Sequence, residues 1–326
     1  MGIRSVLGVT VALALAVGSF ARASDPSALR PTTDDARAVA VGSLFDIGSV
    51  EPDDAFATLF PTQAEAKQGK HPASKRWALL IGINEYRSPT GNNVGSRQDA
   101  VKLKKVLVKK GWRKSHIMVL TDGKATAERI TKGLKWLANK TNRKSVAIFH
   151  YAGHEFPFYN DPDGDGEGRD VAIHATDNRY ILDRDVGRLL GRVRAKKMWI
   201  QFSTCRARGF DDPGIRKKNR VVTYSSREPE YSYEDPEVGH SVFGYYSVVQ
   251  ALMKRKGDRN GDGRISVEEA FRYARARVHQ RTLDRQHPQI SDRLDGPFRL
   301  NVPKPTRSKG GGGGTSQTCL YGVCLP

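Results

Sequence analysis

Two residues able to do acid–base and nucleophilic chemistry stand at the ends of largely apolar segments. His154 ends "SVAIFHYAGH", and Cys205 ends "KKMWIQFSTC" 51 residues later. Short apolar runs of this kind are typical of buried parallel strands, and the carboxyl ends of such strands meet at one edge of a sheet. Neighbouring strands lie about 5 Å apart, so the imidazole could take the thiol proton and leave a thiolate to attack a carbonyl carbon. The spacing therefore predicts a Cys–His dyad.

The sequence leaves other roles open for the same residue types. Among three cysteines, Cys319 and Cys324 lie close together in the tail and can close a small loop with each other. Cys205 is then the odd one, which indicates a free thiol, an intermolecular bridge or an inert buried side chain. His150, inside a predicted strand, is expected to be packed in the core, and His240 is expected at the start of a helix.

Strand-like and helix-like segments alternate between these motifs. This order predicts βαβ units in one α/β domain over residues 75–303, with helices on both faces of a mostly parallel sheet. Thr126 is expected to cap one helix, and Asp183 or Asp185 to open another. The expected strands are "RWALLIGI", "HIMVL", "SVAIFHYAGH", a short one at Val171–Ala175, "KKMWIQFSTC", "RVVTYSS" and a closing "PFRLNV".

Both ends of the chain differ in composition from this domain. Residues 1–23 combine a basic start, an apolar run and small residues before Ser24, which predicts a cleaved signal peptide. Residues 24–74 lack periodicity and are interrupted by prolines, as in a disordered pro-segment or linker. Residues 304–326 form a glycine-rich linker and a cysteine-containing tail. The mature chain is thus expected to lack a transmembrane segment and to be secreted or held in the cell envelope.

The chain is strongly basic, with a formal net charge of +19. Its lysines and arginines are scattered, without the basic helix and interleaved aromatics of a nucleic-acid-binding surface. The charge therefore argues against a specific nucleic-acid partner and indicates a solvated surface, with anionic envelope surfaces as a possible partner.

Residues 258–269, "DRNGDGRISVEE", fit the EF-hand calcium loop at every specified position. Gly263 permits the sharp turn, and the predicted Ca²⁺ ligands are Asp258, Asn260, Asp262, the Arg264 carbonyl, Ser266 and Glu269. The alternative is a polar turn between helices that binds no ion. A second acidic stretch offers Asp161, Asp163 and Asp165 but has an alanine at its twelfth position. It is either a solvated turn or a weaker cation site.

Several of these segments together resemble the caspase and metacaspase family of cysteine endopeptidases. "YAGHE" and "STCRARG" are similar to the family's histidine and cysteine motifs, and "WALLIGINEY" and "RQDAVKLKKVL" to its first strand and following helix. "VVTYSSREPEYSYED" resembles the strand and substrate loop after the cysteine. The resemblance covers about residues 75–303 and implies a caspase-like three-layer sandwich, in which a mostly parallel six-stranded sheet is flanked by helices.

The resemblance also implies roles for individual residues. His154 would be the general base and acid, and Cys205 the nucleophile that forms an acyl-enzyme. Backbone N–H groups of Gly153, Glu155 and Cys205 would hold the oxyanion, and the substrate-binding positions would be Ser203, Asp170 and Arg227.

Two positions depart from the family pattern. Glu155 replaces a glycine, so that its side chain either crowds the oxyanion hole or pairs with the imidazole. Ser203 replaces an aspartate that recognises basic substrate residues. We therefore expect an exported, calcium-binding cysteine endopeptidase that acts on protein or peptide substrates. The alternative is a catalytically inactive caspase-fold protein that binds calcium in the envelope or serves as an adaptor.

Overall fold

A computed structural model describes residues 72–303 except 163, 165 and 167, together with the backbone of two short strands, β12 (Cys319–Leu320) and β13 (Val323–Cys324). The predicted signal peptide and pro-segment, and most of the tail, lie outside the described residues. Cys319 and Cys324 are register partners across β12 and β13, and their pairing stays a prediction. Within the described part, no helix is long and apolar enough to cross a membrane.

The core of the protein is a six-stranded sheet in the order β11-β8-β7-β3-β1-β2. Five strands run parallel, and β11 pairs antiparallel with β8 at one edge. The predicted mostly parallel sheet is thus confirmed. The strand bounds are β1 (Arg76–Gly82), β2 (Ile117–Thr121), β3 (Val146–Ala152), β7 (Lys197–Ser203), β8 (Arg220–Tyr224) and β11 (Gln289–Asp292).

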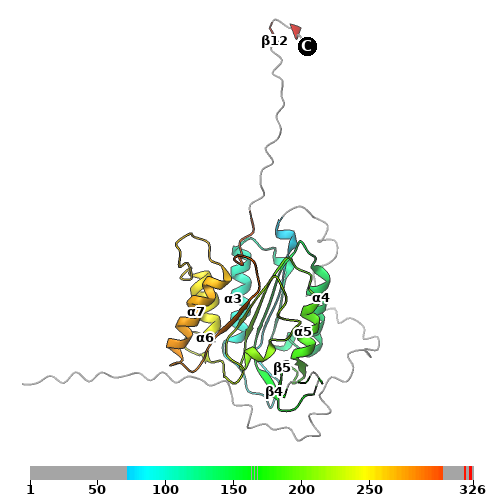
Figure 1. The fold of residues 1–326 in the computed structure, drawn as a ribbon, viewed down its shortest axis with the longest axis vertical. Helices are drawn as coiled ribbons and strands as arrows, with labels where there is room; N and C mark the ends of the chain where they lie inside the picture. The colour runs from blue at the N-terminus through cyan, green and yellow to red at the C-terminus, as the bar shows by residue number, and fades with distance from the viewer. Residues whose placement is uncertain are drawn as a thin grey trace, which may run out of the picture.

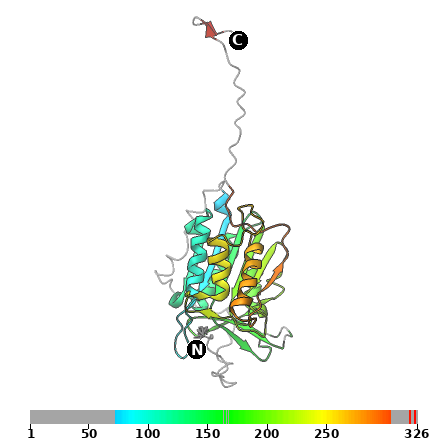
Figure 2. The same ribbon diagram turned by 90° about the vertical axis from the view of Figure 1, so that its left-hand side faces the viewer.

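Helices cover both faces of this sheet (Figure 1). One face packs against α4 (Ala127–Lys140) and α5 (Asp183–Gly191), and the other against α3 (Ser96–Lys109), α6 (Val242–Gly244) with its π-wound continuation η7 (Tyr245–Met253), and α7 (Val267–Arg281). Figure 2 shows the helices of this second face side by side. Alternate residues of β1 separate the two cores, because Leu79 joins the α4 side whereas Leu80 joins the α3 side.

The capping and boundary predictions are largely correct. The Thr126 side chain accepts a hydrogen bond from Arg129 N at 3.3 Å, and Asp183 is the first residue of α5. The closing strand was placed wrongly. Residues 297–302 form only an isolated bridge between Arg299 and Ser266, while Phe298 and Leu300 are buried in the α3-side core. The last strand is instead β11, whose sequence QISD has no apolar pattern.

A second, smaller sheet lies at the carboxyl ends of the parallel strands. It contains β4 (Glu155–Phe158), β5 (Asp170–His174) and β6 (Tyr180–Leu182), all antiparallel, and β4 and β5 appear at the lower end of Figure 1. A two-stranded pair, β9 (Glu234–Asp235) and β10 (His240–Ser241), completes the described sheets of the domain. These elements frame the candidate site.

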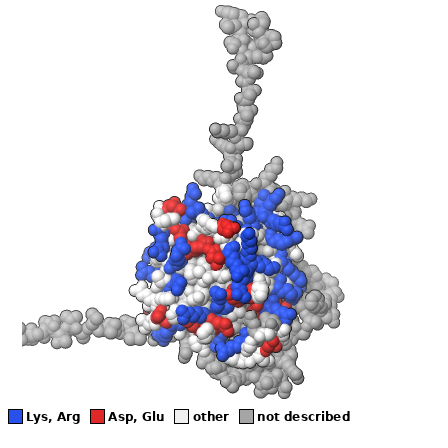
Figure 3. Space-filling view, viewed as in Figure 1, with Lys and Arg blue, Asp and Glu red and all other residues white. Residues whose placement is uncertain are grey.

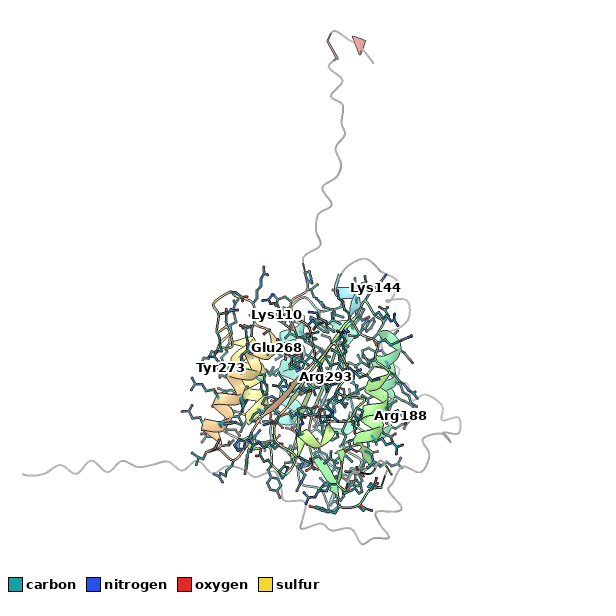
Figure 4. The ribbon with its side chains drawn as sticks, in the orientation of Figure 1. Lys110, Lys144, Arg188, Glu268, Tyr273 and Arg293 are labelled. Carbon is teal, nitrogen blue, oxygen red and sulfur yellow. The ribbon has the colours of Figure 1, made fainter. Side chains whose placement is uncertain are left out.

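Basic side chains cover much of the surface in Figure 3 and are interspersed with fewer acidic ones. Lys110 at the end of α3 and Arg188 on α5 illustrate this spread across both helical layers (Figure 4). The pattern agrees with a solvated basic surface.

Candidate active site

The topology places His154 and Cys205 at adjacent strand ends. β3 and β7 are parallel neighbours, and Ala152 is the register partner of Ser203. His154 lies two residues after Ala152, and Cys205 lies two residues after Ser203. The two strands are therefore neighbours, as predicted. Thr204 ties the two connections together, since its hydroxyl donates to the Gly153 carbonyl at 2.7 Å.

Cys205 is buried beneath the loop between β8 and β9 (residues 225–233), with only 8% of its surface exposed. Its Sγ accepts a hydrogen bond from Ser232 N at 3.4 Å and lies 3.8 Å from the Ser232 carbonyl oxygen, to which it donates. Burial, aided by the Glu155 carboxylate, raises the pKa of this thiol to about 12. The sulfur is therefore a protonated thiol at neutral pH in this conformation.

His154 is oriented by two groups that the sequence did not single out. Its Nε2 lies 2.9 Å from the Gly91 carbonyl oxygen, and its backbone N–H donates to the Tyr86 hydroxyl at 2.7 Å. Because a carbonyl only accepts, Nε2 carries the proton and Nδ1 is left as the basic nitrogen. Burial lowers the pKa of His154 below its usual value, which keeps the imidazole neutral. Within the described residues, no hydrogen bond joins this ring to the Cys205 sulfur.

Glu155 pairs with Arg206 and not with the imidazole. Its carboxylate lies 2.6 Å from Arg206 Nη1, and only 1% of the side chain is exposed. Burial raises the pKa of Glu155 to about 7 although Arg206 opposes the shift. Arg206 itself has a positive φ of 47°, donates its backbone N–H to the Glu230 carbonyl at 2.7 Å, and lies 5.3 Å above the Tyr231 ring. The expected pairing of Glu155 with the imidazole is therefore not found, and crowding of the oxyanion hole by its side chain stays a prediction.

The predicted oxyanion donors are only partly free. Gly153 N donates to the Ser203 carbonyl at 3.4 Å, so this N–H is engaged between the strands. A Cβ at Gly153 would lie 2.7 Å from the Tyr86 hydroxyl oxygen and 2.8 Å from that of Tyr151, which explains the need for glycine there. The oxyanion role of Glu155 and Cys205 remains a prediction.

Two buried carboxylates that the sequence did not single out, Asp99 and Glu234, lie next to Ser241, the residue that contacts Ser203. The Ser203 hydroxyl is 2.9 Å from that of Ser241, which in turn donates to Asp99. The other Asp99 oxygen is 2.7 Å from His240 Nδ1. The Glu234 carboxylate, which accepts from Ser96, is close enough to raise the pKa of Cys205 slightly. Burial raises the pKa of Glu234 itself, and Asp99 adds to this effect.

The other substrate-binding predictions fall elsewhere. Asp170 is fully buried in β5, where it and Asp212 help burial raise the pKa of Asp183 to about 8. Arg227 is half exposed, and its guanidinium lies 3.6 Å from the Glu230 carboxylate. His150, by contrast, behaves as predicted for a core residue, with Nδ1 3.0 Å from Gln201 Oε1.

The 258–269 loop has the turns that a calcium loop requires. Gly263 has a φ of 71°, and its N–H donates to Asp258 Oδ2 at 3.0 Å. Asp258 Oδ1 is buried and has no hydrogen-bond partner among the described residues, so an oxygen ligand is left over for a cation. Asn260, Asp262, Arg264 and Ser266 follow in the predicted order, and the Arg264 N–H donates to Asp262 Oδ1 at 2.7 Å.

Two of the predicted ligands are engaged outside a cation-binding arrangement. Glu269 accepts from Ser266 N at 2.9 Å, as the capping box of α7, and Asp262 Oδ2 lies 3.2 Å from Arg299 Nη2. In the second acidic stretch, Asp161 accepts from the N–H groups of Gly164 and Gly166. Asp163 and Asp165 lie outside the described residues.

Comparisons with known proteins agree with this architecture. The family model described as "Caspase domain" matches residues 75–299. Metacaspase-1 of Candida albicans is 28% identical over 209 residues, which are 56% of this chain and 46% of the relative. Metacaspase-1 of Lodderomyces elongisporus is 28% identical over 123 residues, or 33% of this chain and 27% of the relative. The chain thus spans less than half the length of these curated relatives.

A solved structure supports the fold alone. The crystal structure of protein GSU0716 from Geobacter sulfurreducens superposes with a TM-score of 0.51 at 14% identity, covering 71% of this chain and 95% of that one. Because the family model spans most of the chain, the protein belongs to the caspase-domain family.

Proposed function

We propose that this protein is a cysteine-type endopeptidase in which Cys205 is the nucleophile and His154 the base. The observation that carries the proposal is the pairing of β3 with β7, which brings both residues to one edge of the sheet. Nδ1 of His154 takes the thiol proton, Sγ attacks the peptide carbonyl carbon, and the imidazolium returns the proton to the leaving amine. Water then hydrolyses the thioester, and His154 acts as its base.

The loop over Cys205 makes this a latent conformation. Catalysis requires the two Ser232 contacts to the sulfur to break. Their loss would expose Sγ to solvent and substrate, and so lower the thiol pKa by removing the burial that raises it.

We propose a basic side chain as the substrate residue next to the scissile bond. Ser203 cannot supply a charge, but Asp99 and Glu234 supply two carboxylates in its immediate neighbourhood. A lysine or arginine entering there would neutralise carboxylates that burial otherwise penalises. Glu234→Gln should lower kcat/KM for such substrates more than it lowers the rate of Cys205 alkylation. Equal loss with basic and acidic substrates would contradict this assignment.

We also propose calcium as a ligand, at the loop of residues 258–269. The turn at Gly263 and the unpartnered Asp258 Oδ1 support it, and binding would require Glu269 to leave its capping position on α7. Calcium would supply charge neutralisation and order to this loop. Calorimetric titration of wild type against Asp258→Ala tests the site, with Asp185→Asn on α5 as a control. Identical binding by wild type and Asp258→Ala would refute it.

Export to the envelope or the medium is a further part of the proposal. It rests on the composition of residues 1–23, and the basic surface suits anionic envelope polymers. N-terminal sequencing of protein recovered from outside the cytoplasm should begin near Ser24; an intact N-terminus there would contradict cleavage.

The decisive test of activity is hydrolysis of a fluorogenic peptide library by the mature protein, with calcium or chelator, against Cys205→Ala. Cleavage that depends on Cys205, and labelling of its sulfur by an acyloxymethyl-ketone inhibitor, are expected. The second candidate function, a non-catalytic calcium-binding adaptor, is favoured by the covered and protonated thiol. Absence of cleavage and of labelling under every condition would select it.

A further inference from the structure

A cluster of two histidines and a carboxylate contains none of the residues of the dyad or of the 258–269 loop. His279 is in the last turn of α7, Asp284 is in the turn that follows, and His287 precedes β11. One ligand atom from each lies within 4.8 Å of the others, and among the described residues this is the one such group of three His, Cys, Asp or Glu side chains. We propose that this cluster, the α7-end site, binds a divalent transition metal ion such as zinc.

Two of the three ligand-to-ligand distances match the edges of a metal coordination shell. Asp284 Oδ1 lies 3.1 Å from His279 Nδ1 and 3.3 Å from His287 Nε2. Zinc–nitrogen and zinc–oxygen bonds of about 2.0–2.1 Å place tetrahedral ligands about 3.3 Å apart. The two imidazole rings meet at 73° with centroids 4.8 Å apart, so they do not stack against each other. Three ligands then leave a fourth position for water or another donor.

The protonation pattern of His287 leaves room for a cation. Its Nδ1 lies 2.8 Å from Glu230 Oε1 and must carry a proton, because a carboxylate only accepts. In the neutral imidazole, Nε2 then carries no proton, and its lone pair faces the Asp284 carboxylate, which repels it. A bound metal resolves that repulsion, and an imidazole whose other nitrogen donates to a carboxylate is the usual arrangement of metal-ligating histidines. The competing occupant is a second proton on the ring.

The backbone around Asp284 is held in an unfavourable conformation. Leu283 and Asp284 have φ values of 49° and 60°, in the left-handed region that is unfavourable for non-glycine residues. The Asp284 N–H donates to the His279 carbonyl at 2.8 Å, which closes the turn. This turn is what holds the carboxylate between the two rings.

The donor set distinguishes the site from the proposed calcium loop. Two imidazoles and one carboxylate suit zinc, cobalt or nickel, whereas calcium takes oxygen ligands alone. The site also adjoins the loop over the thiol: Glu230, which supports His287, accepts a hydrogen bond from Arg206 N through its backbone carbonyl. The inference does not depend on peptidase activity.

The test is calorimetric titration of the full chain with zinc, and absorption titration with cobalt. Cys205→Ala, Cys319→Ser and Cys324→Ser are present throughout, so that no thiolate contributes. One equivalent should bind, with the visible spectrum of four- or five-coordinate cobalt. His279→Gln and His287→Gln should abolish this binding, and Glu230→Gln should weaken it about 10–100-fold. Asp185→Asn, a carboxylate change on α5, should leave it unchanged.

A footprint on the unsubstituted histidines guards against variants that merely misfold. Zinc should slow diethylpyrocarbonate modification of His279 and His287 in the cysteine-free chain. No zinc binding, binding that survives both histidine substitutions, or unchanged modification of both rings would overturn the proposal and leave the proton as the occupant.

Discussion

Asp183 provides a quantitative test of the electrostatics at the edge of the sheet. Its carboxyl is buried at the start of α5 and accepts hydrogen bonds from Val171 N at 3.2 Å and Arg184 N at 3.0 Å. Burial is the main cause that raises its pKa from 3.8 to about 8, and the neighbouring Asp212 and Asp170 charges add to it. The folded protein therefore binds a proton at Asp183 that the unfolded chain has released.

The sign and size of the effect on stability follow by linkage. A carboxyl whose pKa is higher in the folded than in the unfolded chain makes its full contribution to the free energy of unfolding below pH 3.8. That contribution falls as the pH rises toward 8. Each pH unit in this window is worth about 1.4 kcal/mol. The penalty is thus roughly 2 kcal/mol at pH 5 and roughly 4 kcal/mol at pH 7. Asp183→Asn removes the titration, so the variant should gain roughly 2–3 kcal/mol of stability over wild type between these pH values.

The assay is urea unfolding at pH 5, 6 and 7 in chelator, followed by fluorescence. The amide that Asp183→Asn introduces could change the free energy of unfolding by a constant amount at every pH. This change cancels, because only the slopes of the free energy of unfolding against pH are compared. Asp185→Asn on the same helix is the matched control, since Asp185 is partly exposed and paired with Arg188 at 2.8 Å. Parallel stability curves for wild type and Asp183→Asn would refute the reasoning, as would the same slope change in the control.

Three further predictions concern packing, capping and the ion pair beside the dyad. Phe202→Ala should lower the free energy of unfolding by about 3–5 kcal/mol, because the ring is fully buried; a loss below 1 kcal/mol by urea denaturation would contradict this. Thr126→Ala should remove the α4 cap and cost about 1 kcal/mol in the same assay, whereas Thr126→Ser should not. Arg206→Gln should destabilise by up to about 3 kcal/mol at pH 8 and less at pH 6, where Glu155 takes a proton. Adding Glu155→Gln should restore most of that loss, and a pH-independent cost would argue against an unpaired carboxylate.

The sheet and the placement of His154 and Cys205 at adjacent strand ends could be predicted because they depend on local patterns. Apolar runs that end in polar residues mark β3 and β7, and a hydroxyl residue before a helical pattern marks the start of α4. The closing strand could not be placed the same way. Phe298 and Leu300 pack in the core without forming a strand, whereas β11 is an edge strand with a single apolar side chain, Ile290. A hydrophobic pattern indicates burial, and in this segment the buried residues are not the ones that pair as a strand.

The partners around the dyad were beyond prediction for a different reason. Asp99 and His240 are 141 residues apart, and Ser96 and Glu234 are 138 residues apart, so no spacing rule relates them. Gly91 contributes only its carbonyl, which leaves no trace in residue type. Such contacts depend on the three-dimensional course of the loops, whereas the sharp turn of the 258–269 loop could be predicted because the residues that make it lie within one short segment.

The two residues that directly follow His154 and Cys205 are physically coupled. Glu155 follows His154 directly, Arg206 follows Cys205 directly, and the same separation of 51 residues brings the carboxylate and the guanidinium within 2.6 Å. A lone Glu155 would place an unpaired buried charge beside the thiol and oppose the thiolate, while a lone Arg206 would favour it. Together they cancel much of each other's field and join β4 to the Glu230 segment of the loop over Cys205. Glu155 is therefore compatible with an active Cys205, because its buried carboxylate is paired with Arg206 and does not act on the thiol as an isolated charge.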